Sequence, residues 1–254
     1  MTINQAFEIL KKSGDIHAAK IIIENMPKIG WLRAHYIAHK LRTGTPVAKI
    51  IHQKWFYGLR FYTNKHTLDP RPDTETLIES VIYDKPKSPK ILDLGTGTGC
   101  IIISLVKNIP SATGIGVDIS WRARQVAKKN IKIHNVQNQI KIKSGNFANK
   151  NLTNEKFDIV VSNPPYIAHN DPRVDIGAKH DPKIALYAKH NGLDAYEQIA
   201  KNAKHWIAND GRIYVEIGSG QEKDIRKIFK KNGWQYVRSN KDLTGIVRVL
   251  VFKI

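Results

Sequence analysis

From residue 90 onward the sequence alternates between short apolar segments and amphipathic segments, and this alternation limits the possible folds more than any other feature. Segments typical of strands lie near residues 90–94, 113–118, 139–143, 157–161, 211–216, 234–238 and 247–253. Helical patterns lie between most of them, at residues 100–108, 120–134, 193–207 and 221–232. Such alternation predicts a parallel sheet covered by helices on both faces. Only "SNKDLTG" separates the last two strands, which is too short for a parallel crossover, so the final strand should run antiparallel.

The part of the chain before residue 90 has a different pattern. Apolar residues recur at helical spacing and predict three helices before residue 42, the second of them capped by Asp15. The aromatic-rich residues 54–68, with a central glycine, predict a hairpin, and Pro72 with early acidic residues predicts a further helix start. We therefore divide the chain into an N-terminal helical domain (residues 1–52), a hairpin with a linker helix (53–89) and a sheet domain (90–254).

Composition excludes several classes of protein. The single cysteine, Cys100, rules out a disulfide framework and a cysteine zinc site, and its apolar neighbours predict a buried thiol. No apolar stretch approaches the roughly 20 residues needed to cross a bilayer, and the N-terminus lacks the apolar region of a signal peptide. We expect a cytoplasmic protein without a membrane segment or a metal.

The chain carries a large excess of positive charge, since 41 Lys and Arg against 22 Asp and Glu give a net charge of +19. Such an excess favours polyanionic partners. The lysines, however, are scattered over every segment, and a lysine-rich genome composition would produce the same count. Both explanations stay open at this point.

The segment "ILDLGTGTGCIIISLV" (residues 91–106) has the order strand, glycine turn, helix. Its glycines, Gly95, Gly97 and Gly99, allow a sharp turn and a close approach of a ligand to the backbone, at the usual ligand crevice of an open α/β sheet. Asp118 ends the next strand, 19 residues after the last of these glycines, where a carboxylate can accept hydrogen bonds from both hydroxyls of a ribose.

Two ligands are compatible with such a loop, and a glycine turn without any ligand is a third interpretation. A dinucleotide fingerprint would need a glycine at position 100, which is Cys100. The G-x-G-x-G spacing, with Asp93 placed to meet an ammonium group, resembles the S-adenosylmethionine loop of the seven-stranded methyltransferases. We therefore predict an α/β fold in which a small N-terminal helical domain and a β-hairpin precede a seven-stranded, Rossmann-like S-adenosylmethionine-dependent methyltransferase domain.

The fourth predicted strand leads into Asn163-Pro164-Pro165-Tyr166, at the same edge of the sheet as the glycine loop. In methyltransferases this motif resembles that of enzymes that methylate a planar nitrogen, which is a poor nucleophile because its lone pair is delocalised. The side-chain oxygen of Asn163 and the carbonyl of Pro164 can accept the two N–H bonds of such a nitrogen, and the prolines hold these acceptors in place. Tyr166 can pack against the flat amide near the sulfonium. The other interpretation is a proline turn that simply ends a strand.

Along nearly its whole length the chain resembles the HemK/PrmC family, the peptide chain release factor glutamine N5-methyltransferases. Besides N-P-P-Y, the resemblance rests on "GTPVAKIIHQKWFYGLRF" (44–61), "LDPRPDTETLIE" (68–79), "HDPKIALYAKHNGLDAYEQI" (180–199) and "KDLTGIVRVLVF" (241–252). It implies methyl transfer from S-adenosylmethionine to the glutamine of the Gly-Gly-Gln loop of release factors. Such an enzyme acts on the free factor, and we expect a monomer.

The resemblance also implies roles for single residues. Phe147 would cover the adenine face beside Asn146, while Arg71 and Glu75 would order the segment over the site or form a plain helix-start salt bridge. The implied cofactor-binding residues are Asp93, Gly95, Thr96, Gly97, Thr98, Gly99, Asp118, Asn146, Phe147 and Asn163. The implied substrate-binding residues are Asn163, Pro164, Pro165, Tyr166, Arg71 and Glu75, and of these Asn163, Pro164 and Tyr166 are the expected catalytic residues.

Some positions depart from the family's pattern, and two other functions remain. The family usually has glycine where Gln53 stands and an aromatic residue where His180 stands, and its N-terminal helical part is longer. An adenine-N6 methyltransferase of DNA or RNA would share N-P-P-Y and explain the positive charge, but it would need a base-flipping pocket and a target-recognition region. A regulator that binds the cofactor without turnover would not need the Asn163–Tyr166 clamp.

Overall fold

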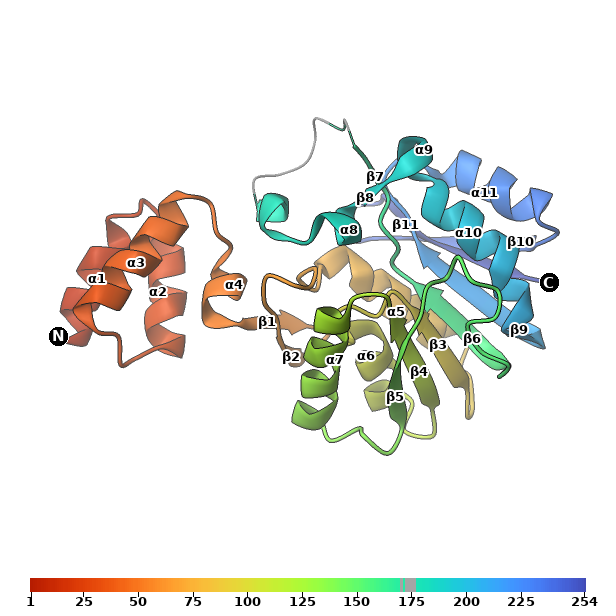
Figure 1. Ribbon diagram of the computed structural model, residues 1–254, viewed down its shortest axis with the longest axis horizontal. Coiled ribbons are helices and arrows are strands. Elements are labelled where there is room, and N and C mark those ends of the chain that lie inside the picture. The colour runs from red at the N-terminus through yellow and green to blue at the C-terminus, as the bar shows by residue number, and fades with distance from the viewer. Residues whose placement is uncertain (170, 172–176) are drawn as a thin grey trace.

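A seven-stranded sheet forms the centre of the C-terminal part of the chain in the computed structural model, which describes residues 1–169, 171 and 177–254 (Figure 1). Its strands are β3 (Lys90–Leu94), β4 (Thr113–Asp118), β5 (Ile140–Ser144), β6 (Phe157–Ser162), β9 (Ile207–Glu216), β10 (Gln235–Lys241) and β11 (Val247–Lys253). The strand order is β10-β11-β9-β6-β3-β4-β5. β11 runs antiparallel to both of its neighbours, β9 and β10, and the other pairs are parallel. The predicted antiparallel last strand is therefore confirmed.

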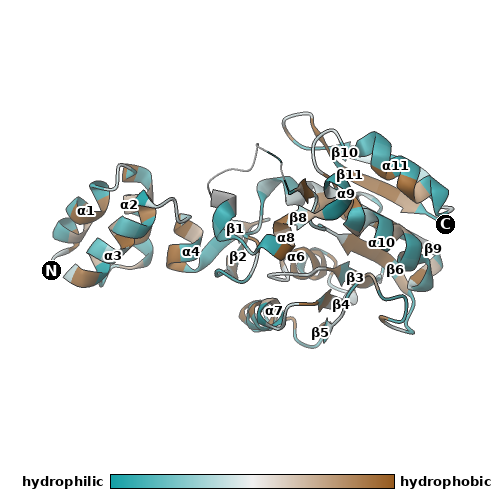
Figure 2. Ribbon diagram, turned by 45° about the horizontal axis from the view of Figure 1, so that its top comes forward, coloured by the Kyte–Doolittle hydropathy of each residue, from teal (hydrophilic) through white to brown (hydrophobic). Residues whose placement is uncertain are grey.

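Helices cover both faces of this sheet, as predicted. Residues of α5 (Glu75–Tyr83), α6 (Cys100–Asn108) and α7 (Trp121–Ile133) belong to the apolar core on one face. Residues of α10 (Asp194–Asn202) and α11 (Glu222–Lys231) belong to the core on the other face. Figure 2 shows the hydrophobic strands between helices that are more hydrophilic on their outer sides. The alternating pattern thus places one core on each face of the sheet.

The start of β9 differs from the prediction. We expected a helix to residue 207 and a strand from residue 211, but α10 ends at Asn202 and β9 already begins at Ile207. A 3-10 turn, Ala203–His205, lies between them. Phe157 of β6 pairs with Ile207 of β9, and the next pair is Ile159 with Arg212, so β9 has more residues between these two pairs than β6 has. The polar Asn-Asp-Gly segment therefore bulges out of the ladder, which is why it has the composition of a loop.

The N-terminal residues form a helical bundle with its own core, at the left of Figure 1. Its helices are α1 (Ile3–Lys11), α2 (Ile16–Asn25), α3 (Trp31–Arg42) and the short α4 (Val47–Ile51), the last of which was not predicted. Asp15 caps α2 as expected, since its side chain accepts a hydrogen bond from the Ala18 amide at 2.8 Å.

A hairpin connects the bundle to the sheet. It consists of β1 (Gln53–Phe56) and β2 (Leu59–Tyr62), shorter than the predicted residues 54–68. Phe56 and Phe61 are buried in the same core as α5 and α6, so the hairpin packs on the sheet domain rather than on the bundle. A 3-10 turn, Pro72–Thr74, then leads into α5. The domain boundaries at residues 52 and 89 stay a prediction.

Several short elements after β6 were not predicted. They are β7 (Ile167–Ala168), a 3-10 turn (Gly177–His180), α8 (Lys183–Leu186), β8 (Tyr187–Ala188) and α9 (Lys189–Gly192). β7 and β8 pair in parallel as a two-stranded sheet. Within the described ranges, no helix has the length and apolarity required to cross a membrane.

Candidate active site

A cavity of about 500 Å3 lies at the carboxyl ends of β3, β4 and β6, within the usual size range of small-molecule sites. The glycine loop after β3 forms one wall, and Asp118 at the end of β4 forms another. Residues that follow β5 and β6 complete it, together with the segment that precedes α5 and part of the segment from α8 to α10. The topology therefore brings the predicted cofactor loop and the double-proline turn to one cavity, as the parallel strands required.

The glycine loop makes the sharp turn that its composition predicted. Gly95, Gly97 and Gly99 have φ angles of 74°, 54° and 80°, in the left-handed region that favours glycine. The amides of Gly95 and Thr96 both donate to the carbonyl of Val117 at 2.9 Å, which ties the loop to the end of β4. Of the predicted loop residues, Gly95, Thr96, Gly97 and Thr98 line the cavity, and Gly99 caps α6 beside it.

Asp118 lines the cavity and organises its surroundings. Its Oδ2 atom accepts the Gly97 amide at 2.9 Å, and its Oδ1 atom accepts the Ser120 amide at 2.8 Å. Burial raises the pKa of this carboxyl group, although the two hydrogen bonds lower it. Each carboxylate oxygen can accept a second hydrogen bond, so Asp118 keeps acceptor capacity toward a ligand.

Asp93 lies behind the loop and is not part of the cavity wall. It is fully buried, its Oδ2 accepts the Thr96 hydroxyl at 2.5 Å, and its Oδ1 has no hydrogen-bond partner among the described residues. Burial raises its pKa to about 7, although the Thr96 hydroxyl lowers it. The Oδ1 atom has spare acceptor capacity, and the contact of Asp93 with the ammonium group of a ligand stays a prediction.

The cavity has the features that S-adenosylmethionine requires. Asn146 and Phe147 line it after β5, and Phe147 also packs on the core below. Its carbonyl accepts the Asn202 side chain at 3.0 Å, which fixes this part of the wall. An aromatic ring, a carboxylate with free acceptor capacity and an open glycine backbone suit the adenine, the ribose and the amino acid part, respectively.

Cys100 also borders the cavity, and burial raises the pKa of its thiol to about 12, as expected for a buried cysteine.

The double-proline turn places two of its four residues in the cavity wall. Asn163 and Pro165 line the cavity, while Pro164 and Tyr166 do not. The Nδ2 atom of Asn163 donates to the hydroxyl of Thr74 at 3.1 Å. Because the two ends of a carboxamide point in different directions, the Oδ1 atom faces away from Thr74. Thr74 also lines the cavity and was not singled out from the sequence.

Tyr166 is held by contacts that the sequence did not indicate. Its carbonyl accepts the Gln221 side chain at 3.0 Å, and Gln221 in turn accepts the Gly218 amide at 3.0 Å. Gly192 packs so closely that a Cβ atom there would lie 2.1 Å from the Tyr166 carbonyl oxygen. Gly192 lies in the segment 180–199, one of the segments on which the family resemblance rests, and its lack of a side chain leaves room for the backbone of the turn.

Arg71 and Glu75, the predicted ordering residues, contact different parts of the molecule. Arg71 lines the cavity and donates to Asp181 at 2.8 Å, whereas Glu75 accepts the Tyr57 amide at 2.7 Å in the hairpin turn. Asp181 also lies 2.8 Å from Lys49, a buried lysine that contacts Asp69 at the same distance. This charge cluster, in which Lys49, Asp69 and Asp181 are buried and Arg71 is partly exposed, joins the end of the bundle to the segment that follows the turn.

The closing motif of the chain serves the same region. Asp242 accepts the amides of Thr244 and Ile246 and the Nε of Arg248 at 2.8–3.0 Å, which builds the turn between β10 and β11. Arg248 then reaches Asp73 at 2.8 Å, next to Thr74. The last strand thereby orients the residue that contacts Asn163.

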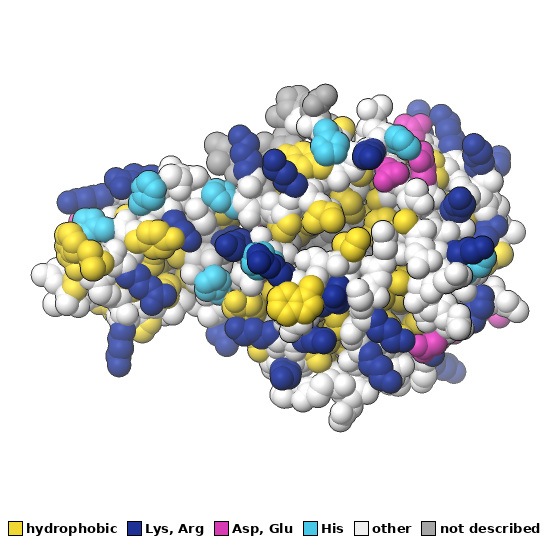
Figure 3. All heavy atoms as spheres, viewed as in Figure 1, with side chains coloured by type: hydrophobic (Ala, Val, Ile, Leu, Met, Phe, Trp, Pro, Cys, Tyr) yellow, Lys and Arg dark blue, Asp and Glu magenta, His cyan; other side chains and the backbone are white. Residues whose placement is uncertain are grey.

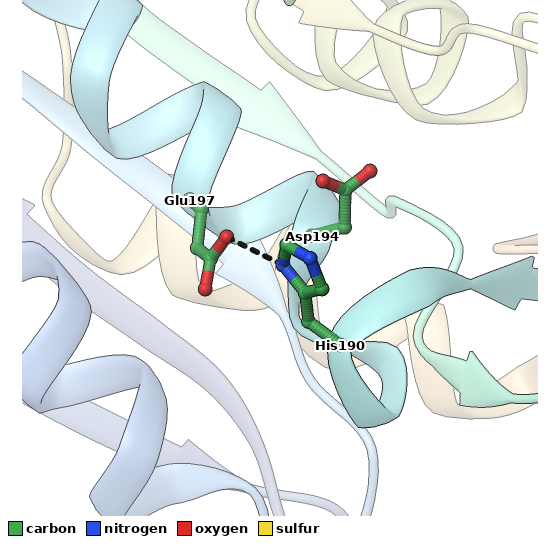
Figure 4. A group of neighbouring side chains, drawn as sticks. All are labelled: His190, Asp194 and Glu197. Carbon is green, nitrogen blue, oxygen red and sulfur yellow. Dashed lines mark hydrogen bonds and ion pairs between the residues drawn. The ribbon is translucent and has the colours of Figure 1, made fainter.

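One further group of polar side chains lies at the rim of the cavity. His190, Asp194 and Glu197 have potential ligand atoms within 4.8 Å of one another (Figure 4). The Nδ1 atom of His190 lies 2.9 Å from Glu197, and the His190 side chain is 62% exposed. We assign no metal to this group, because an exposed hydrogen bond between His190 and Glu197 accounts for the position of these two side chains.

Comparisons with known proteins identify the family. The Methyltransferase small domain matches residues 66–180. A bifunctional methyltransferase of Rickettsia felis is 38% identical over 82% of this chain and 45% of its own length. The chain thus spans about half the length of the curated relatives of this kind. A release factor glutamine methyltransferase of Agrobacterium fabrum is 38% identical over 83% of this chain and 75% of its own length. The chain belongs to the release factor glutamine methyltransferase family.

Solved structures agree with this family at the level of the fold. A ribosomal protein L11 methylase of Lactobacillus delbrueckii has a TM-score of 0.56 and 16% identity, covering 74% of this chain and 81% of that one. A TehB-like SAM-dependent methyltransferase of Corynebacterium glutamicum has a TM-score of 0.50 and 18% identity, covering 70% and 86%. The predicted methyltransferase fold is confirmed.

Proposed function

We propose that this chain transfers a methyl group from S-adenosylmethionine to the side-chain amide nitrogen of the glutamine in the Gly-Gly-Gln loop of peptide chain release factors. Membership of the release factor glutamine methyltransferase family supports this acceptor. The hMettl16 catalytic domain, solved in complex with the MAT2A 3'UTR hairpin 1, is only 14% identical to this chain, so this likeness is one of fold and does not favour the adenine-N6 alternative.

The observation that carries the proposal is the position of Asn163. Its carboxamide lies in the wall of the cavity that contains the glycine loop, and its Nδ2 atom is engaged by Thr74, so that its oxygen faces away from that contact. An amide nitrogen is a poor nucleophile unless its lone pair is directed at the methyl group. An oxygen that accepts one of the glutamine N–H bonds orients the NH2 group and stabilises the positive charge that develops on nitrogen.

The other residues hold the two reactants. When bound, S-adenosylmethionine supplies an electrophilic methyl group. Asp118, Phe147 and the loop from Gly95 to Thr98 would hold it, because they line the cavity and offer acceptors, a ring and open backbone. Pro164 and Pro165 have no amide hydrogen, so neither proline can donate a hydrogen bond to the Asn163 oxygen.

We further propose that a release factor, and not nucleic acid, is the macromolecular partner, and that the protein works as a cytoplasmic monomer. In Figure 3 the Lys and Arg side chains are spread over the whole visible face, from the helical bundle to the sheet domain. A nucleic-acid site would instead call for a continuous basic stripe at the cavity.

A transfer assay with labelled cofactor tests the proposal. Purified release factor, the same factor with its Gly-Gly-Gln glutamine replaced by alanine, and duplex DNA are offered side by side. We expect label on the first acceptor only. Equal label on the glutamine variant would refute the assigned nitrogen, and label on DNA would favour the adenine alternative. Sizing of the active fraction by light scattering tests the monomer.

A further inference from the structure

We infer that Glu216 is a positioning residue that sets the direction in which the Asn163 carboxamide presents its oxygen to the cavity. The inference rests on the proposed function, since it concerns the clamp for the acceptor amide. Glu216 is the last residue of β9 and is only 1% exposed. Neither the glycine loop nor the double-proline turn contains it.

The surroundings of Glu216 connect it to the clamp. The Thr74 hydroxyl and the Asn163 carboxamide both interact with its carboxyl group and favour the ionised form. Thr74 is itself the acceptor of the Asn163 Nδ2 atom at 3.1 Å. The Oε2 atom of Glu216 makes no hydrogen bond of ordinary length to any described residue, so the carboxyl group has acceptor capacity to spare. Three side chains from three separate elements thus meet at one buried point.

An ionised carboxylate selects one of two orientations of Asn163. The nitrogen and the oxygen of a carboxamide are nearly equal in size, so packing alone does not distinguish them. A carboxylate can only accept hydrogen bonds, and it therefore draws the Thr74 hydroxyl hydrogen and the Asn163 NH2 group toward itself. With the opposite orientation, the NH2 group of Asn163 would face the NH2 group of the substrate, and neither group could accept a hydrogen bond from the other. A protonated carboxyl group can donate and loses this selectivity.

No cation neutralises Glu216 by a close contact among the described residues. The two charged residues whose charges act on it most are Asp73 and Arg248, which pair with each other at 2.8 Å. The charge of Glu216 also acts on the titratable groups of Tyr166, Tyr196 and Cys100. Burial raises the pKa of each of these three groups, so all three stay neutral near pH 7. Burial raises the pKa of Glu216 itself to about 7. Its ionisation therefore changes within the range of an ordinary pH profile.

The test uses the full chain with S-adenosylmethionine and a release factor. Glu216→Gln keeps the size of the side chain but can donate as well as accept. We expect its kcat to fall about tenfold or more, somewhat less than the roughly 10²–10³ for removal of a preorganised group itself. The cofactor Kd from calorimetry should stay within about twofold, and the decline of kcat on the acid side of pH 7 should disappear. Asp93→Asn provides the contrast, because it alters the other buried acid and should weaken cofactor binding.

A second pair of variants keeps the inference testable if Glu216→Gln does not fold. Thr74→Val removes the hydroxyl that lies between Glu216 and Asn163, and Thr74→Ser keeps it. We expect Val to lower kcat and Ser to restore most of it. An unchanged kcat and pH profile in Glu216→Gln, a parallel loss of cofactor binding, or equal rates for Thr74→Val and Thr74→Ser would overturn the inference. If the wild type itself failed to methylate any release factor, the proposed function would be at fault instead.

Discussion

Replacing Lys49 by methionine should destabilise the protein more than any single change on its surface. The Lys49 side chain is only 5% exposed, and its ammonium group lies 2.8 Å from both Asp69 and Asp181. It also donates to the carbonyls of Asn64 and Thr67. Lys49→Met keeps the apolar stem of the side chain but leaves two buried carboxyl groups facing each other. Asp181 would retain Arg71, and Asp69 would retain the Thr63 hydroxyl at 2.5 Å.

The magnitude follows from the cost of an uncompensated buried charge. Removing one partner of a buried ion pair costs about 3–5 kcal/mol, and here one cation serves two acids, so we expect roughly 4 kcal/mol. For a chain of 254 residues this corresponds to a thermal midpoint lower by roughly 8–16 °C, at about 2–4 °C per kcal/mol. Even in the wild type, burial raises the pKa of Asp181 despite Lys49, so the charge of this acid adds little to stability. Asp181→Asn in the Lys49→Met background should therefore recover part of the loss.

The sign of the pH dependence gives an independent check. Burial already raises the folded-state pKa of Asp181 in the wild type, and removing Lys49, which lowers this pKa, raises it further above that of the unfolded chain. The folded variant then binds protons that the unfolded chain does not, so its deficit relative to wild type should shrink as the pH falls from 7 toward 5.

Denaturant unfolding at both pH values measures these differences. The matched control is Lys227→Met, which removes an exposed ion pair with Asp224 and should change stability by less than about 0.5 kcal/mol. A loss below about 1 kcal/mol in Lys49→Met, or a double variant less stable than the single one, would show that the cluster does not act as described.

Three other predictions concern the site and the sheet. Asn163→Ala should lower kcat by roughly 10²–10³, the scale for one preorganised polar group, while the cofactor Kd from calorimetry changes little; an unchanged kcat would contradict the clamp. Asp118→Ala should weaken cofactor binding before it lowers kcat, and the opposite order would remove Asp118 from the cofactor site. Burial raises the pKa of Asp84, but hydrogen bonds from Tyr214, Arg212 and Arg238 outweigh it and hold this pKa below its usual range. Asp84→Asn should therefore cost about 1–2 kcal/mol near pH 7, at the low end because the group is partly open to solvent. Since the folded pKa is depressed, this cost should be present above about pH 4 and vanish in acid unfolding curves below it.

The sequence predicts those parts of the fold that depend on local pattern. β3, β4 and α6 begin and end at the predicted residues, because each is a run of mostly buried residues between turn residues. The start of β9 was missed because its bulge has the composition of a loop. β7, β8 and α8 have two to four residues each, too few for any periodicity to show.

The residues of the candidate site fall into two similar groups, those that the local sequence pattern predicts and those that it does not. Residues in contiguous motifs, such as the glycine loop and the double-proline turn, could be found from the sequence. Thr74, Gln221 and Glu216 could not, because each acts through a contact with a residue far away in the chain. Thr74 and Asn163 are 89 positions apart, and Gln221 and Tyr166 are 55 apart. The segments 68–79 and 241–252 resemble the family and so indicated that these regions matter for function. The resemblance did not reveal which contacts their residues make.

Residues far apart in the chain contact the double-proline turn or the segment beside it, and the chemistry of that turn explains why. A turn with two prolines lacks two backbone donors, so it cannot be held by a regular ladder of hydrogen bonds. Its position must come from outside: Gln221 holds the Tyr166 carbonyl, Thr74 holds the Asn163 side chain, and Arg248 with Asp73 holds the segment that carries Thr74. An acceptor that orients a weak nucleophile is effective only if it does not have to reorganise during the reaction. In the proposed mechanism, these distant residues keep one carboxamide still, and a change in any of them should alter turnover before it alters cofactor binding.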